Sequence, residues 1–242
     1  MTLEITRRAS LALIASAAGS AALAQTSPAP SEGSENSGIQ EFAIGDENAP
    51  IQVVEYASFT CPHCANFHRD VLPLIKANYV DTGKIRLIYR PVYFDGPGLW
   101  ADMAARCAKD NDQFFAIADI LYEQQAEWSR AGSQAGVAAG IVAAGRQGGL
   151  DEETILACLQ DNDTAQALVT DFQINAERDG INSTPSFVID GVLTPNMSYE
   201  SFVEIFEAKM APVYAAQSAE DNELCETGGD LRRENGARIF CP

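Results

Sequence analysis

Two cysteines, Cys61 and Cys64, stand two residues apart, the spacing of a dithiol that can close into a disulfide and reopen. The apolar run before them, residues 51–59, predicts a buried strand, and residues 65–79 place apolar side chains at mostly helical spacing. Cys61 is therefore expected at a helix N-terminus, where unpaired N–H groups and the helix dipole favour a thiolate. Cys64, one turn further in, is expected to be less exposed and to act as the resolving thiol.

The two residues between the cysteines fit the same chemistry. Pro62 suits the first position of a helix, because its missing N–H is not needed there. His63 adds partial or full positive charge beside the sulfur. The four residues together predict a protein that exchanges electrons through sulfur.

A metal site is the first alternative. A cysteine pair at this spacing also binds zinc, with His63 or His68 as a third ligand. The sequence has no second pair of this kind to complete the site, and a purely structural disulfide would gain little from closing so small a loop. We therefore favour a redox-active dithiol and expect neither a metal nor a cofactor.

The N-terminal residues predict export. Arg7 and Arg8 precede an uncharged stretch, residues 9–23, and small residues stand at the positions that signal peptidase reads before Gln25. We expect a signal peptide over residues 1–24, for the general or the twin-arginine route, and a periplasmic protein. In that compartment disulfides persist. Residues 25–38 contain no large apolar side chain and predict a flexible tether.

The charge balance limits the partners. The chain carries 16 basic and 34 acidic side chains, and its formal net charge is −18. Such a surface repels nucleic acid and anionic lipid. We therefore expect no nucleic-acid partner.

Strand-like and helical segments alternate in an order that predicts an α/β fold. Strands are expected at residues 39–44, 51–59 and 84–90, then a helical block, then a hairpin at 186–193 that turns at Asp190-Gly191. A last helix is expected at residues 199–211. This order is that of a thioredoxin-like fold with a helical insertion after the third strand.

With Cys61-Pro62-His63-Cys64 after a strand, and Thr184-Pro185 leading into Phe187-Val188-Ile189-Asp190-Gly191, the chain resembles the DsbA family of secreted thiol:disulfide oxidoreductases. The resemblance covers residues 39–211. It implies a thioredoxin-like domain at 39–97 and 180–211, a helical insertion domain at 98–179, and a C-terminal tail at 212–242 that holds a cysteine pair.

The resemblance also implies roles for residues. Cys61 matches the nucleophile, Cys64 its buried partner, and Pro185 the cis-proline that holds the backbone of Thr184 open to a substrate strand. Pro62 and His63 match the oxidising version of the motif. Glu55, an acid inside an apolar run and therefore costly to bury, matches the buried acid that helps to move the proton of the inner cysteine; an acid at an exposed strand end is the alternative.

Four further cysteines remain, and they allow three pairings. Cys107 and Cys158 fall on helical segments of the insertion, where some α-proteobacterial relatives carry a disulfide. Cys225 and Cys241 lie in a polar tail that needs a covalent constraint to stay ordered. We therefore expect structural disulfides 107–158 and 225–241.

The resemblance favours a periplasmic oxidase that donates the Cys61–Cys64 disulfide to newly exported or unfolded cysteine-containing proteins and is reoxidised by a DsbB-type membrane partner. A disulfide isomerase or reductase on the same fold is the runner-up, and a periplasmic metal-binding protein comes third. Isomerases of this superfamily use an N-terminal oligomerisation segment, for which residues 25–38 are too short and too polar. A monomeric oxidase is therefore expected.

Overall fold

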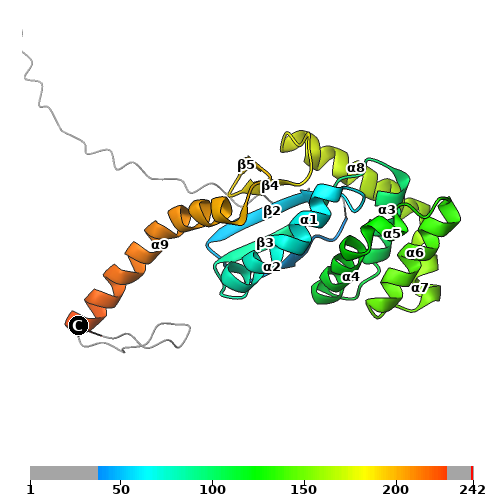
Figure 1. The fold of residues 1–242 in the computed structure, drawn as a ribbon. Helices are drawn as coiled ribbons and strands as arrows, with labels where there is room; N and C mark the ends of the chain where they lie inside the picture. Colours follow the sequence, from blue (N-terminus) through cyan, green and yellow to red (C-terminus); the bar gives the residue numbers. More distant parts are fainter. Residues whose placement is uncertain (1–37, 228–240, 242) are drawn as a thin grey trace, which may run out of the picture.

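A five-stranded sheet with the strand order β1-β3-β2-β4-β5 lies at the centre of the fold (Figure 1). The computed structural model describes residues 38–227 and Cys241. Only β2 and β3 run parallel; the other three neighbouring pairs are antiparallel. The strands are β1 (Phe42–Ile44), β2 (Ile51–Ala57), β3 (Ile85–Pro91), β4 (Ser186–Ile189) and β5 (Val192–Pro195).

Six helices stand between β3 and β4 as an insertion, and Figure 1 shows α3 to α7 gathered beside the sheet while α8 returns to it. The fold class expected from the sequence, thioredoxin-like with a helical insertion after the third strand, is confirmed. The helices are α1 (Pro62–Asp70), α2 (Leu72–Ile75), the π-helical η1 (Lys76–Val80), α3 (Gly96–Ala105), α4 (Asn111–Glu123), α5 (Gln125–Trp128), α6 (Gln134–Gln147), α7 (Glu152–Leu159), α8 (Asn162–Arg178) and α9 (Tyr199–Thr227).

The two faces of the sheet are covered by different helices, because successive side chains of a strand point to opposite sides. On one face Phe187 of β4 packs against Phe67 of α1 and Phe202 of α9. On the other face Tyr56 of β2 belongs to a second apolar cluster, against which Phe172 of α8 packs. Glu55 precedes Tyr56 and therefore points to the α1 side.

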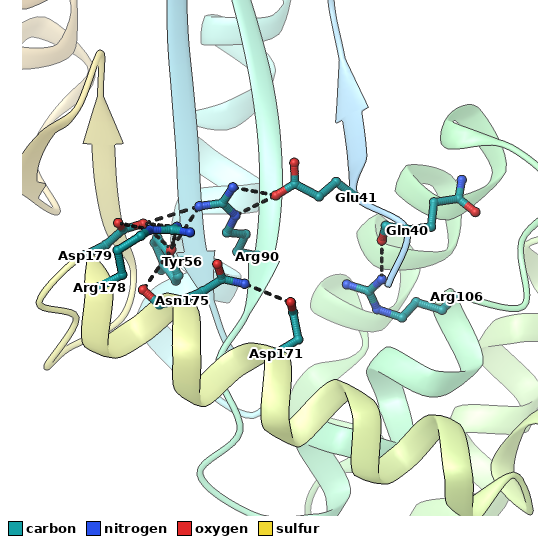
Figure 2. Close-up of polar contacts among 9 residues, drawn as sticks. All are labelled: Gln40, Glu41, Tyr56, Arg90, Arg106, Asp171, Asn175, Arg178 and Asp179. Carbon is teal, nitrogen blue, oxygen red and sulfur yellow. Dashed lines mark hydrogen bonds and ion pairs between the residues drawn. The ribbon is translucent and has the colours of Figure 1, made fainter. Parts of the chain in front are cut away.

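A buried polar network fastens the C-terminal end of α8 to the sheet (Figure 2). The Arg90 side chain in β3 is 3% exposed and donates from Nε to Glu41 at 2.6 Å and from NH1 to Asp179 at 3.3 Å. The Tyr56 hydroxyl donates a short hydrogen bond to Asp179 and accepts one from Arg90 at 3.2 Å. Because Asp179 directly follows α8, the network fixes the start of the loop that leads to β4.

The hairpin of β4 and β5 turns where the sequence predicts it. Asp190 and Gly191 both have positive φ, 47° and 80°. This conformation suits the right-handed twist of a two-residue hairpin, and Asp and Gly tolerate it better than most residues. The Asp190 carboxylate also accepts a hydrogen bond from the backbone N–H of Gln52 at 2.8 Å, which ties the turn to β2.

The last helix differs from the expectation. The sequence predicts that it ends near Ala211, whereas α9 continues through Pro212 to Thr227, so Cys225 lies in a helix rather than in an irregular tail. Pro212 removes one backbone hydrogen bond, but the residues that follow include several Ala and Glu, which favour a helix. Phe202, Phe206 and Met210 anchor the first half of α9 in the core, and Figure 1 shows the second half projecting beyond the sheet.

Two disulfides join the four cysteines outside the Cys61–Cys64 motif. Cys107, just after α3, is bonded to Cys158 of α7 with an S–S distance of 1.99 Å, and Cys225 is bonded to Cys241 at 2.00 Å. These are the pairs that the sequence analysis expected. The first closes a loop inside the helical insertion, so it links the turn after α3 covalently to α7.

The expected signal peptide (1–24) and the tether (25–38), apart from Gly38, lie outside the described residues. Within the described part of the chain, no helix is both long and apolar enough to cross a membrane.

Candidate active site

Cys61 occupies the N-cap of α1, and Pro62 stands at the start of the helix. The position follows from the local sequence: β2 ends at Ala57, four residues bridge to the helix, and the proline ring is compatible with its first turn. Cys61 is 8% exposed and Cys64 is fully buried. The structure thus places the outer thiol near the surface and the inner thiol in the core, as the spacing predicted, and both cysteines are unpaired.

The environment of Cys61 stabilises its thiolate. A hydrogen bond from Cys64 has the largest effect; burial opposes it, and Thr184 and the backbone N–H groups of Cys64 and His63 add to it. Together they lower the pKa of Cys61 to about 5. At neutral pH the thiolate therefore predominates. Pro62 and His63 are themselves exposed, and His63 acts on the sulfur through its backbone.

The inner thiol has the opposite tendency. Burial raises the pKa of Cys64 far above its ordinary value, and the hydrogen bond to Cys61 and the charges of Cys61 and Glu55 raise it further. Two thiols one helical turn apart thus differ in both exposure and acidity. Cys61 can attack as a thiolate, whereas Cys64 must lose its proton during the reaction.

A second segment faces the dithiol. The peptide bond between Thr184 and Pro185 is cis, and the Sγ atom of Cys61 lies 3.5 Å from the carbonyl oxygen of Thr184. The two segments meet because β4, which begins at Ser186, pairs with β2, which leads to Cys61. The structure therefore brings together Thr184, Pro185 and the cysteine motif, which the sequence analysis linked by resemblance.

Glu55 is fully buried in β2, so the alternative of an exposed strand end is wrong. Its Oε1 atom lies 3.0 Å from Nε2 of His68, which projects from α1. Burial alone would lower the pKa of His68, but the charge of Glu55, the nearby Asp119 carboxyl group and the hydrogen bond with Glu55 raise it to about 9. His68 is therefore an imidazolium at neutral pH.

In the sequence, His68 stood out only as a possible zinc ligand. Its partnership with Glu55 was missed, although the spacing held a signal: His68 follows Cys64 by four residues, so both lie on one face of a helix. Among the described residues, no three His, Cys, Asp or Glu side chains are grouped as a metal site would require. Nε2 of His68 is instead directed at Glu55.

Gln125 is a second residue that the sequence did not reveal. Gln125 lies in α5 of the insertion. Its Nε2 atom donates hydrogen bonds to the carbonyl oxygens of Phe59 at 2.7 Å and Cys61 at 2.9 Å. Gln125 is 6% exposed, so these carbonyl groups have a protein partner where water has little access. The helical insertion therefore helps to fix the backbone that carries Cys61. Only long-range packing brings Gln125 there.

This chain has a thioredoxin-like fold, with a Cys-Pro-His-Cys motif at a helix N-terminus opposite a cis-proline. These features place it in the class of thioredoxin-like dithiol proteins. A family model described as thioredoxin matches residues 37–208. The chain belongs to the thioredoxin family, and the expected resemblance to DsbA proteins is confirmed.

Individual relatives agree with this assignment. The crystal structure of Wolbachia pipientis alpha-DsbA1 is 25% identical, with a TM-score of 0.66, over 74% of this chain and 94% of that one. Disulfide bond formation protein D of Bacillus subtilis is 25% identical over 173 residues, which are 69% of this chain and 76% of the relative. A Rickettsia bellii relative, provisionally named a protein-disulfide oxidoreductase, is 34% identical over 66% of this chain. The match spans 61% of that relative's length.

Proposed function

We propose that this protein is a thiol:disulfide oxidoreductase of the DsbA type, and that it donates the Cys61–Cys64 disulfide to other proteins. The observation that carries the proposal is the asymmetry of the dithiol: an outer cysteine, 8% exposed, that forms a stable thiolate beside Thr184, and an inner cysteine that is fully buried. The names of the Bacillus and Rickettsia relatives support the same activity.

In the oxidative direction, a substrate thiolate attacks Sγ of Cys61 in the oxidised enzyme. The Cys61–Cys64 bond breaks, Cys64 leaves with the bonding electron pair and takes up a proton, and a mixed disulfide joins Cys61 to the substrate. A second substrate thiolate then attacks the substrate sulfur, and Cys61 leaves as a thiolate. The substrate has been oxidised to a disulfide, and the enzyme has been reduced to a dithiol.

The low pKa of Cys61 favours this direction, because a leaving thiol that is stable as a thiolate leaves faster and stabilises the reduced enzyme. Pro185 and the Thr184 backbone, beside the sulfur, would hold the substrate strand. The roles of Pro62, His63 and Glu55 remain those that the resemblance implies, and the two further disulfides are proposed to be structural.

The proposal extends to the surroundings of the enzyme. We propose a periplasmic monomer with thioredoxin-like and insertion domains bounded as the sequence analysis expects. Its substrates would be newly exported proteins with cysteines, and a DsbB-type membrane protein would reoxidise it. The expected signal peptide supports this location, and the DsbA-like fold supports the partners.

A peptide with two cysteines tests the activity. Oxidised protein mixed with the reduced peptide should yield the peptide disulfide in a one-to-one transfer, and Cys61→Ser should abolish it. Cys64→Ser should instead trap a mixed disulfide at Cys61 when it is challenged with an oxidised peptide. Refolding of a substrate with scrambled disulfides separates oxidase from isomerase. Absence of transfer from the wild-type protein would overturn the proposal.

A further inference from the structure

His68, the partner of the buried Glu55, shares α1 with the inner thiol and also lines a surface cavity. Cys64 and His68 stand one turn apart on α1, so their side chains share a face of the helix. The negative charge of Glu55 acts on Cys64, and Oε1 of Glu55 is bonded to Nε2 of His68. The other oxygen, Oε2, is buried and has no hydrogen-bond partner among the described residues. One oxygen of the carboxyl group that acts on Cys64 is therefore unengaged in the core.

The far side of His68 opens toward solvent. Its Nδ1 atom lies 3.6 Å from Oδ1 of Asp119 on α4, and the Asp119 side chain is 57% exposed. Both residues line a surface cavity of about 510 Å³ between α1–η1 and α4. A buried imidazole thus has a buried carboxylate on one nitrogen and a solvated carboxylate near the other.

The other groups around His68 leave this connection undisturbed. The Tyr122 ring of α4 stacks on the imidazole with centroids 4.0 Å apart, and Tyr89 of β3 meets it edge-on at 6.3 Å. Both tyrosines stay protonated at neutral pH, because burial raises the pKa of each well above its ordinary value. The remaining charged residues of the cavity wall are Arg69, Lys76, Asp81 and Glu123.

We propose that Glu55, His68 and Asp119 form a relay that carries the proton of Cys64 between the core and solvent. The inference rests on the proposed thiol-disulfide exchange and adds the path by which its proton enters and leaves.

In the reduction step the Cys61–Cys64 bond breaks and Cys64 leaves with the electron pair. Its proton comes from Nε2 of the His68 imidazolium by way of Glu55, and the neutral imidazole that remains regains a proton from solvent through the cavity beside Asp119. Reoxidation by a disulfide reverses the path. Cys61 first attacks the oxidant, which releases one thiolate and forms a mixed disulfide. His68 then gives a proton to solvent beside Asp119 and takes up the Cys64 proton through Glu55. The Cys64 thiolate attacks Sγ of Cys61, and the second thiolate of the oxidant leaves. His68 is therefore an imidazolium again at the end of each cycle.

The relay is tested on the step in which Cys64 acts. Reduced protein is mixed with excess glutathione disulfide, and quenched-flow mass spectrometry follows first the mixed disulfide at Cys61 and then its closure by Cys64. His68→Gln keeps a hydrogen-bonding side chain but carries no exchangeable charge. It should slow closure at least about tenfold at neutral pH and change the pH profile of closure. Alkylation of Cys61, which does not involve Cys64 deprotonation, should keep its rate within about twofold.

Asp119→Asn tests the outer end of the relay on a half-exposed side chain whose replacement does not endanger folding. It should slow closure roughly two- to fivefold, the range expected for a solvated ion pair. Glu123→Gln is the matched control: Glu123 is an acid on the same helix and cavity wall, four residues further on, and it is not among the groups that act on His68. In this variant Cys64 should close the mixed disulfide at the wild-type rate.

The outcomes distinguish a failure of the relay from a failure of the proposed thiol-disulfide exchange. The relay would be overturned if the pH profile of closure in His68→Gln superimposed on that of the wild type. It would also be overturned if Asp119→Asn and Glu123→Gln closed the mixed disulfide at equal rates. If His68→Gln fails to fold, the second comparison decides alone. A wild-type protein that oxidises no peptide would overturn the proposed function, while its closure with glutathione would still test the relay.

Discussion

The Sγ atom of Cys61 lies 3.5 Å from the carbonyl oxygen of Thr184, although the two residues are 123 positions apart in the sequence. The contact exists because β2 and β4 are neighbours in the sheet: one leads to the N-terminus of α1, and the other begins just after Pro185. Residue 184 therefore touches the reacting sulfur and can tune it from outside the Cys-Pro-His-Cys motif.

Replacing Thr184 should change the acidity of Cys61. The Thr184 side chain helps to lower the pKa of Cys61 to about 5. Thr184→Val keeps the shape but removes the hydroxyl, so the midpoint of Cys61 alkylation against pH should rise by roughly 0.5–1 unit. Thr184→Ser, which keeps the hydroxyl, should retain the wild-type midpoint. The same midpoint in both variants would contradict a role for the hydroxyl.

Removing Gln125 should loosen the backbone beneath Cys61. Gln125→Ala leaves the buried carbonyl of Phe59 without its side-chain partner, and a loss of about 1–3 kcal/mol in the free energy of unfolding is expected. Gln124→Ala is the control, because Gln124 bonds Gln147 in an exposed position. Denaturant unfolding of the two variants gives the comparison. Equal destabilisation would show that the contacts of Gln125 do not matter.

The Glu55–His68 pair should make stability depend on pH in the alkaline range. The pKa of His68 is raised to about 9 in the folded protein, against about 6.5 in the unfolded chain. A raised pKa stabilises the fold fully below about pH 6.5, and this stabilisation is lost as the pH rises through 9. The free energy of unfolding of the oxidised protein, whose disulfide cysteines do not titrate, should fall on the order of 2–3 kcal/mol over that interval.

His68→Gln is the control for that measurement. It should lose most of this pH dependence, because glutamine does not titrate. If the free energy of unfolding of the variant fell with pH as steeply as that of the wild type, another group would titrate in this range.

Arg90 should matter for stability and not for the chemistry. Arg90→Met removes the buried cation that joins Glu41 and Asp179 (Figure 2), at a cost of about 3–5 kcal/mol in the free energy of unfolding. Arg86→Met, in the same strand but with a half-buried side chain, should change stability by about 0.5 kcal/mol or less. Arg90 lies on the face opposite α1, so alkylation of Cys61 in the folded variant should keep its midpoint. A shifted midpoint would mean that the network reaches the active site.

The local features of the site could be predicted from the sequence. The apolar run before Cys61 and the proline after it specify a strand and a helix start. These two elements determine which thiol lies nearer the surface. Asp190-Gly191 specifies its turn in the same local way. The end of α9 was predicted wrongly, since Pro212 is a strong local signal that the helix-favouring residues after it outweigh.

The supporting contacts depend on how distant elements pack. His68 reaches Glu55 only because α1 lies over β2, and Gln125 reaches the Cys61 backbone from an inserted helix 64 residues away. No periodicity in the sequence reports such a contact. The burial of Glu55 could be considered in advance, but its partner could not.

The most direct test of the central claim is the reduction potential of the Cys61–Cys64 pair. A pKa of about 5 for Cys61, instead of an ordinary value near 8.5, stabilises the reduced enzyme at pH 7 by about 2.7 kcal/mol, which corresponds to about 60 mV. Equilibrating the protein with glutathione buffers of known ratio and counting free thiols by mass gives the potential. The account predicts a value clearly more oxidising than that of thioredoxin, about −270 mV. A potential at or below that of thioredoxin would contradict a disulfide donor.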